Sequence, residues 1–251
     1  MWDMQIPKKI HYCWFGNGEK PDIVLKCIES WKRNMPDYEI MEWNEHNYDI
    51  NKADFIREAY EQKKWAFVSD YARFDILNEY GGIYVDTDVE FLKPLPKEML
   101  SWCAFTGYES TGAVSPGLIF GAIPRFPITQ ELLTEYNKMH FESNGKNLYK
   151  TVNMVTTEVL ERHEHLRRDQ FQVVDSLALY PSAYFCGFDL DVMEYDIRPE
   201  TISVHHYAGS WRSQSVKSKI QTWVKKRFGI QGYKRLLKIK RRLFGISGAT
   251  K

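Results

Sequence analysis

The sequence lacks several features that mark common classes of protein. No run of apolar residues approaches the roughly 20 that a membrane-spanning helix needs. The first residues contain neither the basic stretch nor the apolar core of a signal peptide. The four cysteines are scattered and show no C-x-x-C spacing, so nothing indicates a disulfide framework or a zinc site. This cysteine usage favours a reducing compartment.

Two common nucleotide-binding loops are also missing. Gly16-x-Gly18 lacks the third glycine and the downstream acidic residue of a dinucleotide-binding fingerprint, and no Walker-type phosphate loop is present. The sequence therefore favours neither a nicotinamide-dependent enzyme nor a P-loop nucleotidase.

Acidic residues are absent from one region, residues 201–251, which contains thirteen Lys or Arg. Residues 1–200 hold 21 basic and 33 acidic residues, so the net charge of +1 hides two unlike parts. The chain of 251 residues, 43% of them apolar, suffices for one core and a modest extension. We expect a catalytic domain over residues 1–211 and a basic tail over residues 212–251.

The most informative stretch covers residues 67–91. Apolar residues at helical spacing predict a helix whose start is capped by Ser69 or Asp70. Glycines at 81–82 end the helix and permit a tight reversal. Residues 83–85 are β-rich and predict a short buried strand.

Two aspartates, Asp86 and Asp88, stand where that strand ends. Ligands in open α/β sheets bind beyond the carboxyl ends of strands. Residues two apart on a strand share a face, so both carboxylates aim at one spot if strand geometry continues that far. A divalent cation relieves their repulsion, and Mg²⁺ or Mn²⁺ suits such oxygen ligands. An acidic turn facing solvent is the alternative, but the preceding helix, glycines and strand favour a site.

Similar patterns predict the other elements. We expect strands at 6–16, 38–43, 102–105, 117–122, 171–175 and 178–180, and helices at 21–33, 52–64, 129–141 and 148–161. The alternation of strand and helix in the first half implies right-handed crossovers. It predicts an α/β fold with a mostly parallel central sheet flanked by helices. Residues 182–200 have no clear pattern.

A long pattern connects this chain to a known family. It reads Ser69-Asp70-x-x-Arg73-x-x-x-Leu77-x-x-x-Gly81-Gly82-x-Tyr84-x-Asp86-x-Asp88. This run resembles the "DXD" sugar-nucleotide glycosyltransferases, above all glycosyltransferase family 32, with its Och1-type mannosyltransferases and bacterial capsular polysaccharide enzymes. It is also similar to the catalytic domain of the clostridial glucosylating toxins. The resemblance implies a GT-A-like nucleotide-diphospho-sugar transferase fold.

The resemblance also implies roles for individual residues. Asp88 would bind Mn²⁺ or Mg²⁺ directly, and Asp86 would contact the ribose and the metal shell. Asp70 and Arg73 would bind the donor's hydroxyls and diphosphate, since a guanidinium fork suits phosphate. Trp14, in a segment similar to the family's first strand, would lie near the nucleotide base. A surface ion pair for Asp70 and Arg73, and a core position for Trp14, are the alternatives.

A second segment, residues 202–211, resembles the family's C-terminal "HHxxGSW" motif. By that resemblance His205 or His206 completes the metal shell, and neutral imidazole suits Mn²⁺ better than Mg²⁺. Neighbours on a strand face opposite ways, so the sequence does not choose between them. Ser210 and Trp211 would reach the diphosphate. The alternative is a strand that ends in a turn with a buried His and Trp.

The function implied is a metal-dependent retaining glycosyltransferase. It would move a sugar from a nucleotide-sugar, with a UDP-sugar favoured, to a hydroxyl of a glycan or lipid-linked oligosaccharide in surface polysaccharide synthesis. A metal-dependent nucleotidyltransferase or phosphohydrolase also uses paired aspartates, but should show a third carboxylate nearby. A non-catalytic carbohydrate-binding or membrane-binding module and a toxin-like protein glycosyltransferase are further alternatives.

The tail combines aromatic and aliphatic residues at helical spacing with Lys and Arg opposite them. Such a pattern over residues 212–247 predicts amphipathic helices on an anionic membrane surface. Nucleic-acid binding, or a helix that covers the domain, are alternatives that we rank lower. We expect a cytoplasmic protein, peripherally associated with the inner face of the cell membrane, and no nucleic-acid partner.

Overall fold

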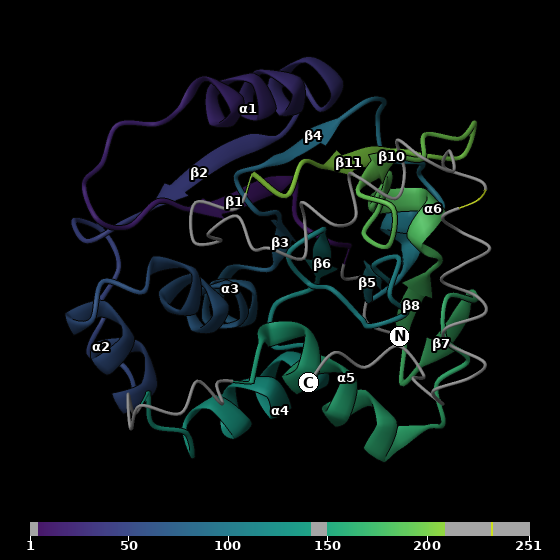
Figure 1. Ribbon diagram of the computed structural model, residues 1–251. Coiled ribbons are helices and arrows are strands. Elements are labelled where there is room, and N and C mark those ends of the chain that lie inside the picture. Colours follow the sequence, from purple (N-terminus) through teal and green to yellow (C-terminus); the bar gives the residue numbers. More distant parts are fainter. Residues whose placement is uncertain (1–4, 142–149, 209–231, 233–251) are drawn as a thin grey trace.

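A central sheet organises the fold (Figure 1). The computed structural model describes residues 5–141, 150–208 and 232. Seven strands lie in the order β2-β1-β3-β6-β5-β8-β7. Their bounds are β1 Lys9–Cys13, β2 Glu39–Trp43, β3 Gly82–Tyr84, β5 Ala104–Gly107, β6 Phe120–Ala122, β7 Gln172–Val174 and β8 Leu177–Tyr180.

Strand directions confirm a mostly parallel sheet, with two reversals. β1 pairs in parallel with β2 and with β3, and β5 pairs in parallel with β8. β6 runs antiparallel between β3 and β5, and β7 runs antiparallel to β8 at one edge. Five strands therefore point the same way, and their carboxyl ends meet at one edge, where ligands of open α/β sheets bind.

Helices cover both faces of the sheet, as Figure 1 shows. The bounds are α1 Asp22–Asn34, α2 Asp54–Glu61, α3 Trp65–Tyr80, α4 Pro127–Tyr136, α5 Val152–His163 and α6 Ser182–Phe185, with a 3₁₀ turn at Met99–Ser101. α1 lies on one face, and α2 to α5 lie on the other. This arrangement confirms the predicted α/β class.

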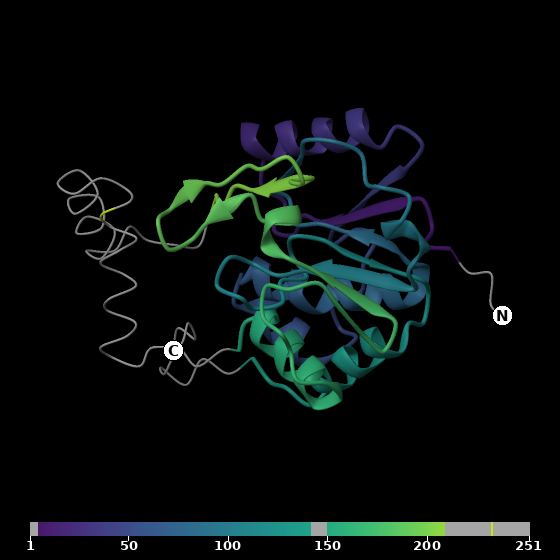
Figure 2. The same cartoon turned by 90° about the vertical axis from the view of Figure 1, so that its right-hand side faces the viewer.

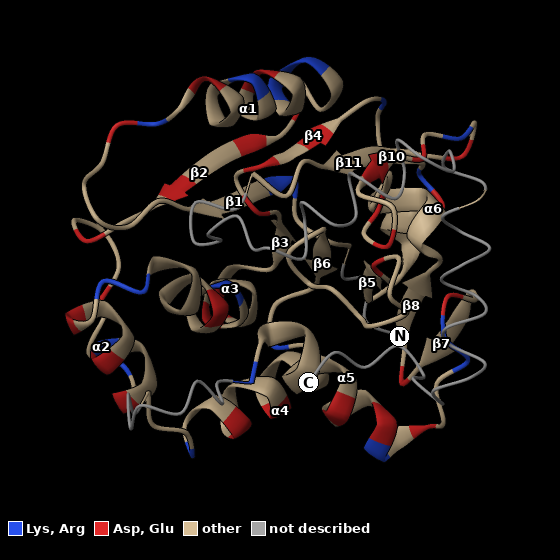
Figure 3. Ribbon diagram, viewed as in Figure 1, with Lys and Arg blue, Asp and Glu red and all other residues tan. Residues whose placement is uncertain are grey.

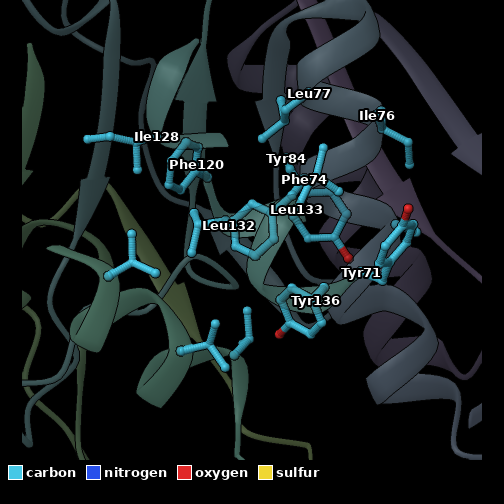
Figure 4. Packing of buried hydrophobic residues seen from close by; sticks show 14 of the residues in the cluster. Tyr71, Phe74, Ile76, Leu77, Tyr84, Phe120, Ile128, Leu132, Leu133 and Tyr136 are labelled. Carbon is cyan, nitrogen blue, oxygen red and sulfur yellow. The ribbon is translucent and has the colours of Figure 1, made fainter. Parts of the chain in front are cut away.

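Two hydrophobic clusters fill the spaces on either side of the sheet. One holds the buried residues of α1, including Trp31, together with Ile10 and Ile83 of the sheet. The other joins α2 to α5 to the opposite face, and Figure 4 shows Phe74 against Phe120 there. The two clusters pack the sheet between layers of helices. This packing fixes the position of the carboxyl ends of the strands relative to the helices.

The helix α3 begins earlier than the sequence suggested. It starts at Trp65, so Ser69 and Asp70 lie within it, and the prediction that either caps its start is wrong. Ser69 Oγ donates instead to the Trp65 carbonyl, 3.0 Å away, in the preceding turn. Most of α3 is buried, including both Asp70 and Arg73. Tertiary packing therefore extends the helix beyond the local capping signal.

The helix ends where predicted, and two features require the glycines that follow it: a positive φ and the close approach of His11. Gly81 and Gly82 have φ of 60° and 103°, a region that favours glycine. A Cβ on Gly82 would lie 2.8 Å from Nε2 of the buried His11. That nitrogen is 2.8 Å from the Gly81 carbonyl, while Nδ1 accepts from the indole of Trp43 at 3.1 Å. Burial lowers the pKa of His11 to about 4, so this link is neutral.

Residues 182–200, which the sequence left unassigned, form α6 and a small hairpin of β9 (Phe188–Asp189) and β10 (Glu194–Tyr195). Figure 2 shows this hairpin extending away from the body. The chain then returns as β11 (Ser203–His205), which pairs antiparallel with β4 (Val89–Phe91). Among the described helices, none has the length and apolarity to cross a bilayer.

Candidate active site

The two predicted aspartates lie on a turn that joins β3 to β4. The Val89 amide donates to the Asp86 carbonyl at 3.1 Å, which closes the turn. Strand geometry therefore stops before Asp88, and a reversal of the chain, rather than alternation on a strand, sets the two carboxylates. The Asp86 amide donates to the Gly117 carbonyl at 2.9 Å, which ties the turn to the segment before β6.

Buried charges surround Asp86 on the side of α3. Nη2 of Arg73 lies 2.7 Å from Oδ1 of Asp70 and 3.3 Å from Oδ1 of Asp86. The Tyr84 hydroxyl donates to the same Asp86 oxygen at 3.2 Å, and its ring lies 4.8 Å from the guanidinium. We call Asp70, Arg73, Tyr84 and Asp86 the Arg73 cluster. The structure thus brings together three of the predicted site residues, Asp70, Arg73 and Asp86. The Asp70–Arg73 pair is not a surface ion pair, because the Arg73 side chain is only 3% exposed.

Burial sets the electrostatics of the Arg73 cluster. It raises the pKa of Asp70 to about 7 and also raises the pKa of Asp86, although the Arg73 charge opposes both shifts. Two carboxylates that share one guanidinium repel each other, which favours a proton on one of them. Nη1 of Arg73 is buried and finds no hydrogen-bond partner among the described residues. An added positive charge, or an oxygen that accepts from Nη1, would relieve this arrangement.

Asp88 is held from the opposite side, by the segment from His205 to Ala208. Nε2 of His205 lies 2.9 Å from its Oδ1, and the Ala208 amide donates to its Oδ2 at 3.0 Å. Burial raises the pKa of Asp88, but the charge and hydrogen bond of His205, together with backbone amides that include Ala208, hold it below its usual value. Burial lowers the pKa of His205, and Asp88 outweighs it in turn, so that pKa is raised. Each group therefore favours the charged form of the other.

The structure separates the two histidines that the sequence could not distinguish. His206 Nε2 lies 2.9 Å from Glu90 Oε2, and its Nδ1 lies 2.7 Å from the Tyr195 hydroxyl. Lys26 of α1 donates to the same Glu90 oxygen at 2.8 Å, and Figure 3 shows acidic β4 beside the basic residues of α1. The predicted metal role of His206 therefore has no support from its side-chain contacts, because neighbours on a strand face opposite ways. Its backbone amide donates to the Asp88 carbonyl at 2.9 Å.

One further predicted residue, Trp14, lies outside this centre. Trp14 follows β1 at the same edge of the sheet, and its indole donates to the Gly18 carbonyl at 2.7 Å. The ring is partly exposed, with Lys20 Nζ 5.8 Å from its centroid, so a core position is excluded. Ser210 and Trp211, and the tail from residue 212 apart from Gly232, fall outside the described residues.

The donor atoms present fit part of a divalent-cation shell. Asp86 and Asp88 supply hard carboxylate oxygens, and Asp86 Oδ2 makes no hydrogen bond within residues 5–141 and 150–208. Over the same ranges no three His, Cys, Asp or Glu side chains converge on one point as a metal site. The four predicted ligands Asp86, Asp88, His205 and His206 therefore do not form a closed set. Mg²⁺ and Mn²⁺ fit such an open site, because they commonly keep positions for water and phosphate.

Sequence reasoning missed two contributors to this centre. Tyr84 holds Asp86 through its hydroxyl, and it stands two residues before Asp86, so alternation on the strand could have found it. Gly117 meets Asp86 from a segment 31 residues along the chain, and no local signal marks it.

Comparison with known proteins gives this centre a family context. Residues 21–106 match the family described as "Glycosyltransferase sugar-binding region containing DXD motif". The match includes α1, α3 and the turn that carries Asp86 and Asp88.

Individual relatives match over limited segments. "Subversion of eukaryotic traffic protein A" from Legionella pneumophila is 29% identical over 39% of this chain and 19% of its own. A human alpha-1,4-N-acetylglucosaminyltransferase is 34% identical over 33% of this chain and 22% of its own. This chain therefore matches a minor part of either relative. The crystal structure of the galactosyltransferase LgtC with donor and acceptor sugar analogs is 11% identical, with a TM-score of 0.47 over 87% of this chain and 95% of that one.

Proposed function

We propose that this chain, whose residues 21–106 match the glycosyltransferase sugar-binding regions with a DXD motif, is a metal-dependent glycosyltransferase. It transfers a sugar from a nucleotide-sugar, a UDP-sugar being favoured, to a hydroxyl of an acceptor. One observation carries the proposal: the turn that holds Asp86 and Asp88 ends a central strand beside a buried arginine with an unpartnered nitrogen. Anionic ligands bind at such an edge.

The protein's own groups have distinct tasks in this proposal. Arg73 fixes Asp86 through Nη2, and its buried Nη1 donates to an oxygen of the bound nucleotide-sugar. His205 and the Ala208 amide fix both oxygens of Asp88. The carboxylates are therefore oriented before the donor arrives, which lowers the reorganisation needed during the reaction.

Asp86 and Asp88 are the residues that would hold Mn²⁺ or Mg²⁺, with His205 beside them as a further candidate ligand. When bound, such an ion supplies Lewis-acid neutralisation of the diphosphate leaving group. Arg73 adds hydrogen-bond donors to the same developing charge, and Trp14 offers a flat face for the base at the exit of β1. Ser210 and Trp211 keep their proposed contact with the diphosphate.

The proposed stereochemistry is retention. The nucleophile is the acceptor hydroxyl: its oxygen bonds to the anomeric carbon on the face that the diphosphate leaves, and its proton passes to the departing phosphate oxygen. No covalent sugar–enzyme bond is formed in this scheme. An inverted anomer in the product, read by NMR of the transferred sugar, would contradict it.

The test of the activity is a panel of nucleotide-sugars assayed for hydrolysis and transfer with Mn²⁺ or Mg²⁺. Asp88→Asn should lower kcat/KM by at least about 100-fold, the effect of removing one group that stabilises developing charge. The matched control is Asp37→Asn, an exposed aspartate whose side chain is 76% exposed. Full activity in Asp88→Asn would favour a non-catalytic module. Hydrolysis of nucleoside triphosphates or phosphate esters without sugar transfer would favour a nucleotidyltransferase or phosphohydrolase.

The cellular role is a further part of the proposal. We place the acceptor on a glycan or lipid-linked oligosaccharide of surface polysaccharide synthesis. Residues 212–251 bring the enzyme to the inner face of the membrane, on the support of their basic and amphipathic sequence. Deletion of residues 217–251 should abolish sedimentation with anionic liposomes and leave hydrolysis of a soluble donor intact. Unchanged sedimentation would refute the membrane role, and transfer to a protein would favour a toxin-like activity.

A further inference from the structure

Gly117 occupies a position where no side chain fits. It lies in the turn before β6, which the Leu118 amide closes on the Ser115 carbonyl at 3.1 Å. A Cβ on Gly117 would stand 2.1 Å from Oδ2 of Asp86 and 3.1 Å from Nη1 of Arg73. The φ of Gly117 lies outside the left-handed region, so its backbone accepts other residues and only the lack of space excludes them. The Asp86 carboxylate oxygen thus fills the place of the absent side chain.

The Asp86 carboxylate has little freedom to move aside. Its Oδ1 is held by the Tyr84 hydroxyl and by Arg73, and those two side chains are buried. Its own amide is tied to the Gly117 carbonyl at 2.9 Å, so the two backbones cannot separate without breaking that bond. A methyl group at position 117 therefore forces the Asp86 side chain to rotate out of the Arg73 cluster.

We propose that Gly117 is a positioning residue for the nucleotide-sugar site, because its missing side chain lets Asp86 take the orientation that binds the metal–diphosphate group. The proposal rests on the proposed function and assigns a role to a residue outside the DXD motif. Gly117 acts through Asp86 and does not itself touch the ligand. Its effect should therefore appear in the binding of the metal and nucleotide, beyond any change in folding stability.

The experiment compares Gly117→Ala with Gly121→Ala in the full-length chain. Gly121 lies four residues further, in β6, and the atoms nearest to a Cβ there belong to the Phe105 ring, with Cε1 2.2 Å away. Both variants thus introduce a methyl clash, but one presses on Asp86 and the other on the apolar core. The measurements are the thermal unfolding midpoint and the affinity for Mn²⁺ with UDP, from the electron paramagnetic resonance signal of free Mn²⁺.

We expect Gly117→Ala to weaken Mn²⁺ binding by about 10-fold or more, the range seen when a group that orients a metal ligand is lost. Gly121→Ala should lower the unfolding midpoint and keep the parent's Mn²⁺ affinity. Parent-like binding in Gly117→Ala, or equal weakening in both variants, overturns the proposal. If the parent chain binds no Mn²⁺ with UDP, the proposed function fails. A crystal structure of Gly117→Ala then decides the positioning role: it is overturned if Asp86 keeps its contacts with Tyr84 and Arg73.

Discussion

The two sides of the Asp86–Asp88 turn are built in different ways. On the α3 side, Asp86 belongs to a buried cluster of charges in which burial raises carboxylate pKa values. On the β11 side, Asp88 is paired with His205, which helps to hold the pKa of Asp88 below its usual value. The first side is drawn from 17 consecutive positions, Asp70 to Asp86, whereas the second joins residues 117 positions apart. Asp86 is therefore held by the buried Asp70–Arg73 pair of a neighbouring helix, and Asp88 by a long-range strand pair that brings in His205.

This difference predicts unequal effects on stability, the largest at Arg73. Arg73→Ala should lower the free energy of unfolding by about 3–5 kcal/mol, because it leaves Asp70 and Asp86 buried without their partner. Arg57→Ala, which removes a solvent-accessible arginine of α2 paired with Asp54 and Glu61, should cost far less, because water screens those ion pairs. Urea titration of both variants measures the contrast. Equal losses of unfolding free energy in Arg73→Ala and Arg57→Ala would show that the buried ion pairs of Arg73 stabilise the fold no more than exposed ones.

A second, pH-dependent effect belongs to the turn that ends α3. The pKa of His11 is about 4 when folded and near 6.5 when unfolded, so between these values the unfolded chain binds the proton more readily. The free energy of unfolding should therefore fall as pH drops from 6.5 to 4, by as much as about 3 kcal/mol from this group. His11→Gln, which does not titrate, should lack this part of the slope. Parallel pH profiles for parent and variant, measured by urea unfolding, would count against a buried neutral histidine.

The smallest effect is expected on the β11 side. His205→Gln removes a charged partner of Asp88 but leaves the Ala208 amide in place, so it should cost about 1.5 kcal/mol. Thermal or urea unfolding checks this value against that of Arg73→Ala. A loss equal to that of Arg73→Ala would remove the contrast between the two sides.

The sequence predicted the α3 side well because its signals are local. Apolar spacing, two glycines and the paired aspartates gave the helix, the reversal and the site at the end of β3. The start of α3 was misplaced, since the partly buried Trp65 and Phe67 pack against the core and extend the helix beyond any capping signal. The condition that strand geometry continues as far as Asp88 is not met, because the turn closed by Val89 intervenes.

The β11 side and the Gly117 contact could not be derived from local patterns. The motif at residues 202–211 suggested a histidine only by resemblance, and the choice of His205 follows from its register opposite Val89 in the β11–β4 pair. The hairpin of β9 and β10 has strands of two residues, too short for any periodic signal. The need for glycine at position 117 comes from its contact with Asp86 in the folded chain. No residue near position 117 in the sequence signals that contact.

The β11–β4 pair also fixes when the centre can come into being during synthesis. Asp88 leaves the ribosome 117 residues before His205, so a nascent chain carries the acidic turn without its histidine for nearly half of translation. A protein released after residue 180 and before residue 203 would contain the segments of all seven strands yet lack His205. Premature termination between these two positions should therefore leave Asp88 without its histidine.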